Sequence, residues 1–509
     1  MEGAPSTAGS IGVDALFQYT GSGVQLFSGM VFYVMAVRLF STNDVGAIAI
    51  FIAILGLFNL IFSFGLTIAA QHFVSYDLGR EDYGSVKKTI YRLFYLSVGL
   101  SLAGLAAIQV LAGGISLVFL HSYKYTELVR ILGIALFGTI MFGILNGILL
   151  GLHRFRISAI ISIVIWITYY FGSLALAVYL RSIGTIVFGW ILGIFLGVAI
   201  ELFVVISSVR RFSGMGKASA NSYIIRYSIP ILFSSVISYG ASYADRFIVS
   251  GLLNLSSLGI YNFALLIASA IGFIAFPFNN LLMPKFSEFF GKGEKERIVS
   301  TAEVSTTLLS YFYVPSALGI AAIAPLILNL LGGPEYAAAS DPLRIISVLT
   351  AFFISENILI QAIASVRKTR VLFYSSSLAL AGNVVLSLIL IPPFGLVGAA
   401  IGFSSVFAIT FSTLYYFARK ESLVSFDILG LLKVWISAVI MFAIVDGASD
   451  IFGLSAYMLL FYILLGVLVY VGLAKVLRVF GRKNRELVLS LFPPSFVRFR
   501  KLLSALVLH

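Results

Sequence analysis

Long apolar stretches recur along almost the whole chain, and they limit what it can fold into. Between residues 11 and 478, only short polar connections separate them. A helix of about 20 apolar residues crosses the hydrocarbon core of a bilayer, and lipid cannot satisfy the backbone polar groups of an open structure. The short alternating segments of a β-barrel are not seen. With 60% hydrophobic and 11% charged residues, the composition leaves too little polar surface for a soluble domain. We therefore expect an all-α polytopic membrane protein.

The apolar runs predict about fourteen transmembrane helices. We place these spans at residues 11–37, 43–66, 88–114, 128–150, 157–180, 183–207, 222–250, 256–282, 299–326, 342–365, 370–391, 395–418, 427–446 and 454–477.

The basic residues support this topology. If the N-terminus is cytoplasmic, 28 of the 34 Lys and Arg residues fall on the inner face, as the positive-inside rule requires. The six left for the outer face are Arg38, Lys124, Arg130, Arg181, Arg246 and Arg344. The net charge of +13 therefore reflects orientation in the membrane, and we expect no nucleic-acid partner. We predict a multi-pass protein of the cell (plasma) membrane with both termini cytoplasmic.

The chain also resembles itself at an offset near 213 residues. The segment VRLFSTNDVGAIAIF (37–51) aligns with VSGLLNLSSLGIYNF (249–263), which places Gly46 on Gly259. This offset covers six spans, an even number, so the two repeats have the same topology and are related by an axis along the membrane normal. We expect two parallel six-helix repeats around a central cavity, plus two extra C-terminal helices.

This repeat divides the chain into five parts. They are an N-terminal six-helix lobe (1–210), a cytoplasmic linker (211–221), a C-terminal six-helix lobe (222–420), two additional transmembrane helices (421–480) and a basic amphipathic tail (481–509). The tail interleaves basic residues with Phe, Leu and Val, which favours a helix on an anionic inner surface. A partner-binding tail is the alternative.

Catalytic and metal-binding patterns are essentially absent from the sequence. There is no cysteine, the four histidines are scattered, and no phosphate-binding G-x-x-x-x-G-K-[ST] loop occurs, so the chain does not hydrolyse a nucleotide itself. We predict a protein that is not an enzyme and that uses no cofactor and no metal.

Polar residues recur at helical spacing in the first and seventh spans, which the repeat relates. At about 100° per residue, they form one stripe on each helix. Serine alone often joins packed membrane helices, but stripes that include larger polar groups favour a water-filled cavity. The candidate cavity residues are Gln18, Gln25, Arg38, Ser235, Ser238, Tyr239, Ser242, Tyr243, Asp245 and Arg246.

The pair Asp245 and Arg246 stands side by side in YGASYADRFIVSGLL (239–253). Adjacent residues on a helix point about 100° apart, so we expect neither to be the main partner of the other. Arg246 falls near the centre of the stripe, and Asp245 falls at its edge, toward a neighbouring helix. Alternatively, both residues mark the outer, interfacial end of the span.

Three carboxylates within predicted spans are candidates for binding a proton or a sodium ion. Glu356 lies in the middle of the tenth span, Glu201 in the inner half of the sixth, and Asp14 near the inner end of the first. Ionisable groups inside a membrane are functional candidates by default. Asp14 is alternatively a favourable charge at a helix N-terminus.

The two repeats, the basic linker and the two added helices resemble the multidrug/oligosaccharidyl-lipid/polysaccharide (MOP) exporter superfamily. The stretches STNDVGAIAIFIAILGLFNLIFSFGL and SYADRFIVSGLLNLSSLGIYNFALLIA are similar to its polysaccharide-biosynthesis branch, the O-antigen-type flippases. The resemblance implies alternating access and a lipid-linked oligosaccharide, polyprenyl or dolichyl phosphate-linked, moved from the cytoplasmic to the outer leaflet. It implies that cavity arginines such as Arg246 receive the phosphate.

Two alternatives remain open from the sequence. One is a cation-coupled multidrug (MATE-type) exporter of the same superfamily, for which Asp14 or Glu356 would bind the ion. The other is a membrane-embedded glycosyltransferase, which would need a larger outer loop than this chain has. We expect membrane lipids and the lipid-linked glycan as partners, a proton or sodium gradient as a candidate driving force, and a functional monomer.

Overall fold

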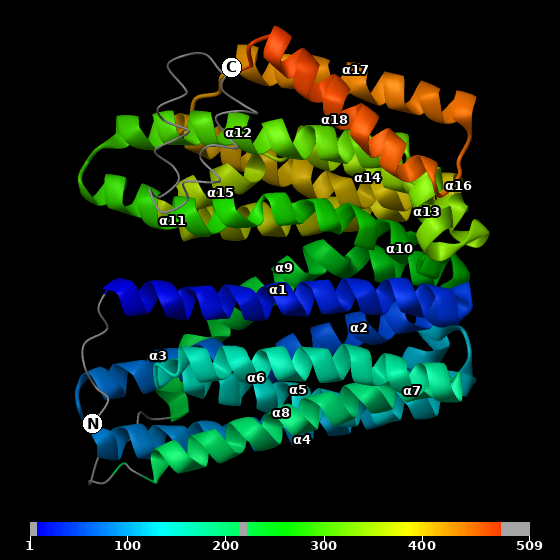
Figure 1. Cartoon of the computed structure of the whole chain (residues 1–509). Coiled ribbons are helices and arrows are strands. Elements are labelled where there is room, and N and C mark those ends of the chain that lie inside the picture. Colours follow the sequence, from blue (N-terminus) through cyan, green and yellow to red (C-terminus); the bar gives the residue numbers. More distant parts are fainter. Residues whose placement is uncertain (1–7, 211, 213–220, 480–509) are drawn as a thin grey trace. The chain divides into compact units, whose positions relative to one another are not determined.

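The computed structural model describes residues 8–210, 212 and 221–479, and these form helices joined by short turns, without a β-strand (Figure 1). The chain divides into two compact units. The first is residues 1–239 with Leu253–Gly259, and the second is Gly240–Leu252 with residues 260–509. The predicted linker, apart from residues 212 and 221, and the tail 481–509 lie outside the described residues. The lobe boundaries expected from the repeat stay a prediction.

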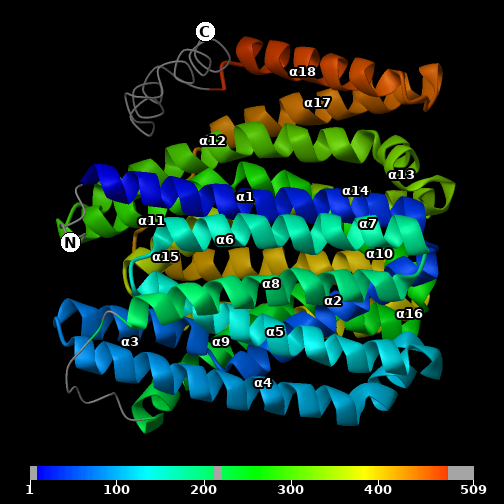
Figure 2. The same cartoon turned by 60° about the horizontal axis from the view of Figure 1, so that its bottom comes forward.

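The first unit contains ten helical elements and parts of two more. They are α1 (Ala8–Leu39), α2 (Thr42–Ser63), α3 (Leu66–Gly79), α4 (Tyr83–Leu120), η1 (Tyr123–Tyr125), α5 (Thr126–Gly151), α6 (Phe155–Ile167), the π-helix η2 (Thr168–Gly172), α7 (Ser173–Leu180) and α8 (Ile183–Val209). Parts of α9 (Asn221–Leu252) and α10 (Leu255–Ile271) also belong to it. Within this unit, α4 packs on α5, α5 on α8, and α1 on α6 (Figure 2).

The second unit holds the rest of α9 and α10 and the C-terminal helices. These are η3 (Gly272–Ile274), α11 (Phe276–Gly291), α12 (Lys295–Ala322), α13 (Ala324–Gly332), η4 (Pro334–Ala339), α14 (Ser340–Phe352), α15 (Glu356–Ser365), α16 (Thr369–Lys420), α17 (Ile428–Phe452) and α18 (Met458–Val476). Helix α12 packs on α14 and α17, α15 packs on α11 and α16, and α17 packs on α18.

In the part of the chain that the structure describes, twelve helices are long and apolar enough to cross a membrane, or thirteen if one bent pair is a single span. This confirms an all-α polytopic membrane protein, but it does not confirm the count of fourteen. Large apolar side chains such as Val110, Phe203 and Leu468 are more than two-thirds exposed, as lipid-facing residues are, because lipid is as apolar as they are.

Helix α16 accounts for part of the difference in count, because two predicted spans, 370–391 and 395–418, fall within it. Gly395 has φ 55° and ψ −128°, so α16 consists of two helical arms joined at a kink. A Cβ on Gly398 would meet the Leu390 carbonyl, and one on Gly402 would meet Ser387. These close approaches show that the second arm packs back along the first.

A contact outside the apolar segments ties the two ends of α16 together. Lys368, just before the helix, donates a hydrogen bond to Glu421, just after it, over 2.5 Å. This hydrogen bond from Lys368 holds the pKa of the Glu421 carboxyl below its usual range. Because the two arms run in opposite directions, both ends of α16 lie on the same side of the second unit.

Several predicted spans are broken rather than continuous. The second span ends at Ser63, where Phe64 and Gly65 both have positive φ, and the chain continues as α3. The tenth span is broken between Phe352 and Glu356 and bends there by 43°. Apolar composition alone does not reveal such breaks, since apolar residues lie close to each of them on both sides.

Helices α2 and α10 approach closely through glycines that the repeat relates. A Cβ on Gly46 would collide with the Leu255 carbonyl, and one on Gly259 would collide with the Thr42 carbonyl. The hydroxyls of Thr42 and Ser256 lie 2.8 Å apart at the same crossing. Small residues thus let the two backbones touch, as in other membrane helix pairs.

Replacing Gly46 with alanine should therefore weaken the first unit. We expect a loss of about 1–3 kcal/mol, the usual cost of overpacking, measured by reversible unfolding in mixed micelles. The matched control is Gly113→Ala in α4, where a Cβ meets nothing within 4 Å. That control should be neutral or stabilising by up to about 1 kcal/mol. Equal effects of the two changes would contradict the close crossing.

Candidate functional site

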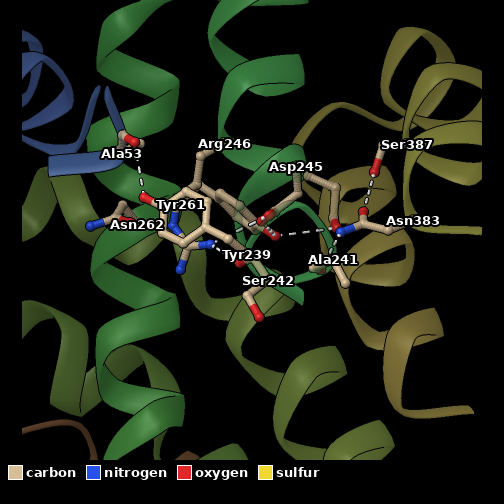
Figure 3. Close-up of polar contacts among 11 residues, drawn as sticks. Ala53, Tyr239, Ala241, Ser242, Asp245, Arg246, Tyr261, Asn262, Asn383 and Ser387 are labelled. Carbon is tan, nitrogen blue, oxygen red and sulfur yellow. Dashed lines mark hydrogen bonds and ion pairs between the residues drawn. The ribbon is translucent and has the colours of Figure 1, made fainter. Parts of the chain in front are cut away.

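The second unit holds Asp245 and Arg246 in the hairpin formed by α9 and α10. The turn between these helices lies at Leu253 and Asn254, and residues equally far from it along the chain lie side by side. Tyr261 and Asn262 on α10 therefore lie opposite the Asp245–Arg246 pair (Figure 3). Each side chain of the pair contacts one of these α10 residues.

Asp245 and Tyr261 are the two fully buried members of the group of Asp245, Arg246, Tyr261 and Asn262. The Oδ2 atom of Asp245 accepts a hydrogen bond from the Tyr261 hydroxyl over 2.8 Å. The same hydroxyl lies 3.2 Å from the Ala399 carbonyl in the second arm of α16. Asp245 thus faces α10, a neighbouring helix.

Arg246 is held on several sides. Its side chain is 13% exposed, its Nε donates to Asn262 Oδ1 over 3.0 Å, and its Nη1 donates to the Ser242 carbonyl over 2.5 Å. The Tyr243 ring lies 4.3 Å from the guanidinium carbon, a cation–π distance. Asp245 Oδ1 lies 3.4 Å from Nη1, so the two charges do touch, but the contact is longer than the Tyr261–Asp245 hydrogen bond.

The first arm of α16 braces this part of α9. Asn383 Nδ2 donates to the Ala241 carbonyl over 3.0 Å, and Ser387 donates to Asn383 Oδ1 over 3.0 Å (Figure 3). Both side chains are fully buried. The backbone one turn before Asp245 is therefore fixed by a satisfied polar network, which holds the Asp245–Arg246 pair in place.

A second polar network lies within the first unit and links four of its helices. Gln18 on α1 donates to the Phe155 carbonyl over 2.7 Å and lies 3.5 Å from the Ser158 hydroxyl on α6. Asn146 on α5 donates to Ser158 over 2.9 Å and to Glu201 Oε1 on α8 over 2.8 Å. Gln18 and Glu201, predicted for different roles, thus belong to one network.

Glu201 and Glu356 each carry one unpaired oxygen. Glu201 is fully buried and Glu356 is 8% exposed, and the Oε2 atom of each lacks a hydrogen-bond partner among the described residues. Glu356, predicted in the middle of the tenth span, lies at a break within the corresponding pair of helices. It is the first residue of α15, directly after the break that follows α14.

The remaining predicted residues are spread over both units. Tyr239 donates to the Ala53 carbonyl of α2 over 2.9 Å within the first unit. The others differ in exposure: Gln25, Ser235 and Tyr243 are half-buried, while Arg38, Ser238 and Ser242 are exposed. The side chain of Asp14 lies outside the described residues.

The second unit also contains an apolar cavity of about 540 Å³. It lies among α12, α13, α17 and α18, and its wall includes Phe312, Ile320, Leu331, Val467 and Val471. The hydroxyls of two further wall residues are occupied: Tyr470 donates to the Tyr311 carbonyl, and Tyr462 donates to the Gly453 carbonyl. Among the described residues, no group of three or more His, Cys, Asp or Glu side chains could hold a metal ion.

Sequence reasoning missed the amides and the tyrosine that hold the charged groups. Asn146 and Asn383 are each the only carboxamide of their predicted spans, and Asn262, which follows Tyr261, is the only one of α10. A carboxamide inside a membrane helix needs a polar partner, and this signal was present in the sequence. The hairpin position of Tyr261 and Asn262 relative to Asp245 and Arg246 was also present there.

Comparison with known proteins gives the family. A family model described as polysaccharide biosynthesis protein matches residues 34–341, more than half of the chain. The chain therefore belongs to this polysaccharide biosynthesis protein family. It is also 25% identical over 250 residues to the "Probable low-salt glycan biosynthesis flippase Agl15" of Haloferax volcanii. That match covers 48% of this chain and 52% of the relative, so it spans about half the length of the relative.

Solved structures share the fold at low sequence identity. A structure of the lipid II flippase MurJ in an inward closed conformation has a TM-score of 0.71 at 18% identity, covering 93% of this chain and all of that one. An inward-facing multidrug resistance MATE family transporter of the MOP superfamily has a TM-score of 0.65 at 14% identity, covering 78% of this chain and 94% of that one. The fold is thus that of MOP-superfamily transporters.

Proposed function

We propose that this protein is a flippase that moves a lipid-linked oligosaccharide, carried on a polyprenyl or dolichyl phosphate, from the cytoplasmic to the outer leaflet. Family membership supports this proposal, as does the relative whose printed name is a glycan biosynthesis flippase. The observation that carries it is Arg246, a nearly buried guanidinium in a membrane-spanning helix, held by Asn262, Tyr243 and Asp245.

Arginine at this position suits a phosphate or pyrophosphate. Its guanidinium is always charged and matches phosphate oxygens geometrically. The cost of keeping it inside a membrane-spanning helix is reduced by the Asp245 carboxylate and by the Asn262 amide oxygen. In the proposed cycle, Arg246 receives the phosphate of the carrier lipid. The residues proposed to contact the glycan or line its path are Tyr243, Ser242, Ser238, Gln25 and Arg38.

The apolar cavity in the second unit suits the lipid part of such a substrate. Its wall residues belong to apolar helices, and the hydroxyls of Tyr462 and Tyr470 on the wall are already hydrogen-bonded. An isoprenoid tail is as apolar as this wall, so the contact would leave no polar group without a partner. We therefore assign it to a stretch of the isoprenoid chain, while the glycan crosses through a polar path.

Energy for transport would come from an ion gradient, with Asp14, Glu201 and Glu356 as the candidate ion-binding residues. The proposed protein is a transporter rather than an enzyme, acts as a monomer, and needs no cofactor.

A cation-coupled multidrug exporter is the second candidate function. The fold shared with the MATE family transporter and the buried carboxyls favour it. The nearly buried arginine favours an anionic substrate instead. Complementation of a strain that lacks a sugar-lipid flippase, run beside a drug-resistance assay, separates the two. We expect rescue of glycan display without added resistance; resistance without rescue would refute the proposal.

We also propose that both termini are cytoplasmic, because the basic residues of the alternate connections gather on that side. The sequence contains no cysteine, so single introduced cysteines report topology cleanly. A cysteine at exposed Glu296 should react with a membrane-impermeant reagent only from the cytoplasm, and one at Tyr457, which is 93% exposed, only from outside. The reverse pattern would overturn the orientation.

A further inference from the structure

The carboxyl groups of the two buried glutamates need either a partner that compensates their negative charge or a proton that removes it. Glu201 is fully buried in α8, and Glu356 is 8% exposed at the start of α15. Each has one carboxyl oxygen without a hydrogen-bond partner in the described part of the chain. An ionised carboxylate in apolar surroundings costs several kcal/mol unless a cation or several donors compensate it.

Within the described ranges, no cationic group compensates Glu201. The helices packed against α8 are α5, α6 and α7 with the π-helix η2. Their ionisable residues are Glu127, Arg130, Arg156, Tyr169, Tyr170 and Tyr179, and Glu127 and Arg130 pair with each other. The side chain that contacts Glu201 is the neutral amide of Asn146.

Glu356 is in the same situation within the second unit. Helices α11, α12 and α16 pack against α15, and their charged residues are Lys285, Glu288, Lys295, Glu296, Arg297, Glu303, Arg370, Arg419 and Lys420. None of these forms an ion pair with Glu356, while Glu288 and Arg297 pair elsewhere.

The surroundings also disfavour a sodium ion. Asn146 directs its Nδ2 amide group at Glu201. The hydrogens of this group carry partial positive charge and therefore repel a cation bound at the carboxylate. Hard cations need several oxygen ligands, and among the described residues no ion pair or hydrogen bond joins the Glu356 Oε2 atom to a second group. A proton neutralises either carboxyl without further ligands.

We propose that Glu201 and Glu356 are two separate proton-binding sites, one in each compact unit, and that both carboxyls are protonated in this conformation. The repeat does not relate them, because Gly143 and Leu414 stand at the corresponding positions. Their use in driving transport rests on the flippase function proposed above. In that cycle, each site would release its proton when its surroundings open to water.

The protonated state can be observed without any transport assay. Infrared spectra of the purified full-length protein near pH 7 should show a carboxylic-acid C=O band, because exposed carboxyls are ionised well below that pH. Glu201→Gln should remove one part of the band, Glu356→Gln another, and the double variant both. The control Glu127→Gln, at an exposed carboxyl, should leave the band unchanged.

No band in the wild type, or a band that either single variant leaves unchanged, would overturn the inference. So would binding of radioactive sodium that either Gln variant abolishes. Because glutamine has the shape of a protonated glutamate, each variant should also keep the wild-type unfolding midpoint, which separates loss of the proton site from misfolding. If the bands behave as expected but no glycan is flipped, the proton sites stand and the proposed substrate fails.

Discussion

Replacing Arg246 with alanine is expected to reduce translocation of a lipid-linked oligosaccharide by about 100-fold. Charge-assisted hydrogen bonds to a phosphate contribute about 1.5–3 kcal/mol each, and about 1.4 kcal/mol corresponds to a tenfold change. The measurement is the rate at which a labelled glycan lipid passes from the exposed to the lumenal leaflet of inverted vesicles, or between the leaflets of proteoliposomes, at equal amounts of membrane-inserted protein.

Two matched variants sharpen this result. Arg246→Lys keeps the charge but loses the planar fork that Asn262 and the Ser242 carbonyl hold, so about a tenfold loss is expected. Arg226→Ala removes an exposed arginine from the same helix and should stay close to wild type. Full activity of the Arg246→Ala variant would remove Arg246 from the substrate site.

Replacing Asp245 with alanine is expected to lower the free energy of unfolding by about 3–5 kcal/mol, the cost of leaving one partner of a buried ion pair uncompensated. The fully buried carboxylate is the hydrogen-bond acceptor of Tyr261 and touches Arg246, so both would lose a partner. Tyr261→Phe, which removes only the hydroxyl, should cost about 1–3 kcal/mol. Reversible unfolding in mixed micelles measures both changes.

The control is Asp341→Ala, whose side chain is 74% exposed and lies 4.0 Å from Arg344. Exposed ion pairs contribute about 0–1 kcal/mol, so this variant should unfold almost as the wild type does. If Asp245→Ala were as stable as Asp341→Ala, the idea that Asp245 anchors the α9–α10 hairpin would be wrong.

Much of the helical framework is predictable from the sequence because hydrophobic length dictates a membrane span. The breaks are not, because Phe64–Gly65 and residues 353–355 interrupt runs in which apolar residues lie close to the break on both sides. At Gly395 the structure has two arms within one 52-residue element, where the sequence predicted two spans. Hydropathy responds to composition, whereas a break depends on backbone dihedral angles that only local packing selects.

For the candidate site, the angle between adjacent residues on a helix predicted that the side chains of Asp245 and Arg246 point in different directions. In the structure, the Asp245 carboxylate accepts a hydrogen bond from Tyr261. The sequence did not reveal that Gln18 joins the Glu201 network through Ser158 and Asn146. A stripe of polar residues gives the face of one helix but not which neighbour covers it. That is decided by how α1, α5, α6 and α8 pack, which is a tertiary property.

The most direct test of the central claim is reconstitution of the purified protein in liposomes that carry a fluorescent polyprenyl-diphosphate oligosaccharide in one leaflet. We predict exchange between leaflets at least about 100-fold faster with the wild type than with the Arg246→Ala variant. We also predict no stimulation of lipophilic-cation efflux. Equal exchange by the two proteins, together with cation efflux that needs Glu356, would contradict the account and favour a multidrug exporter.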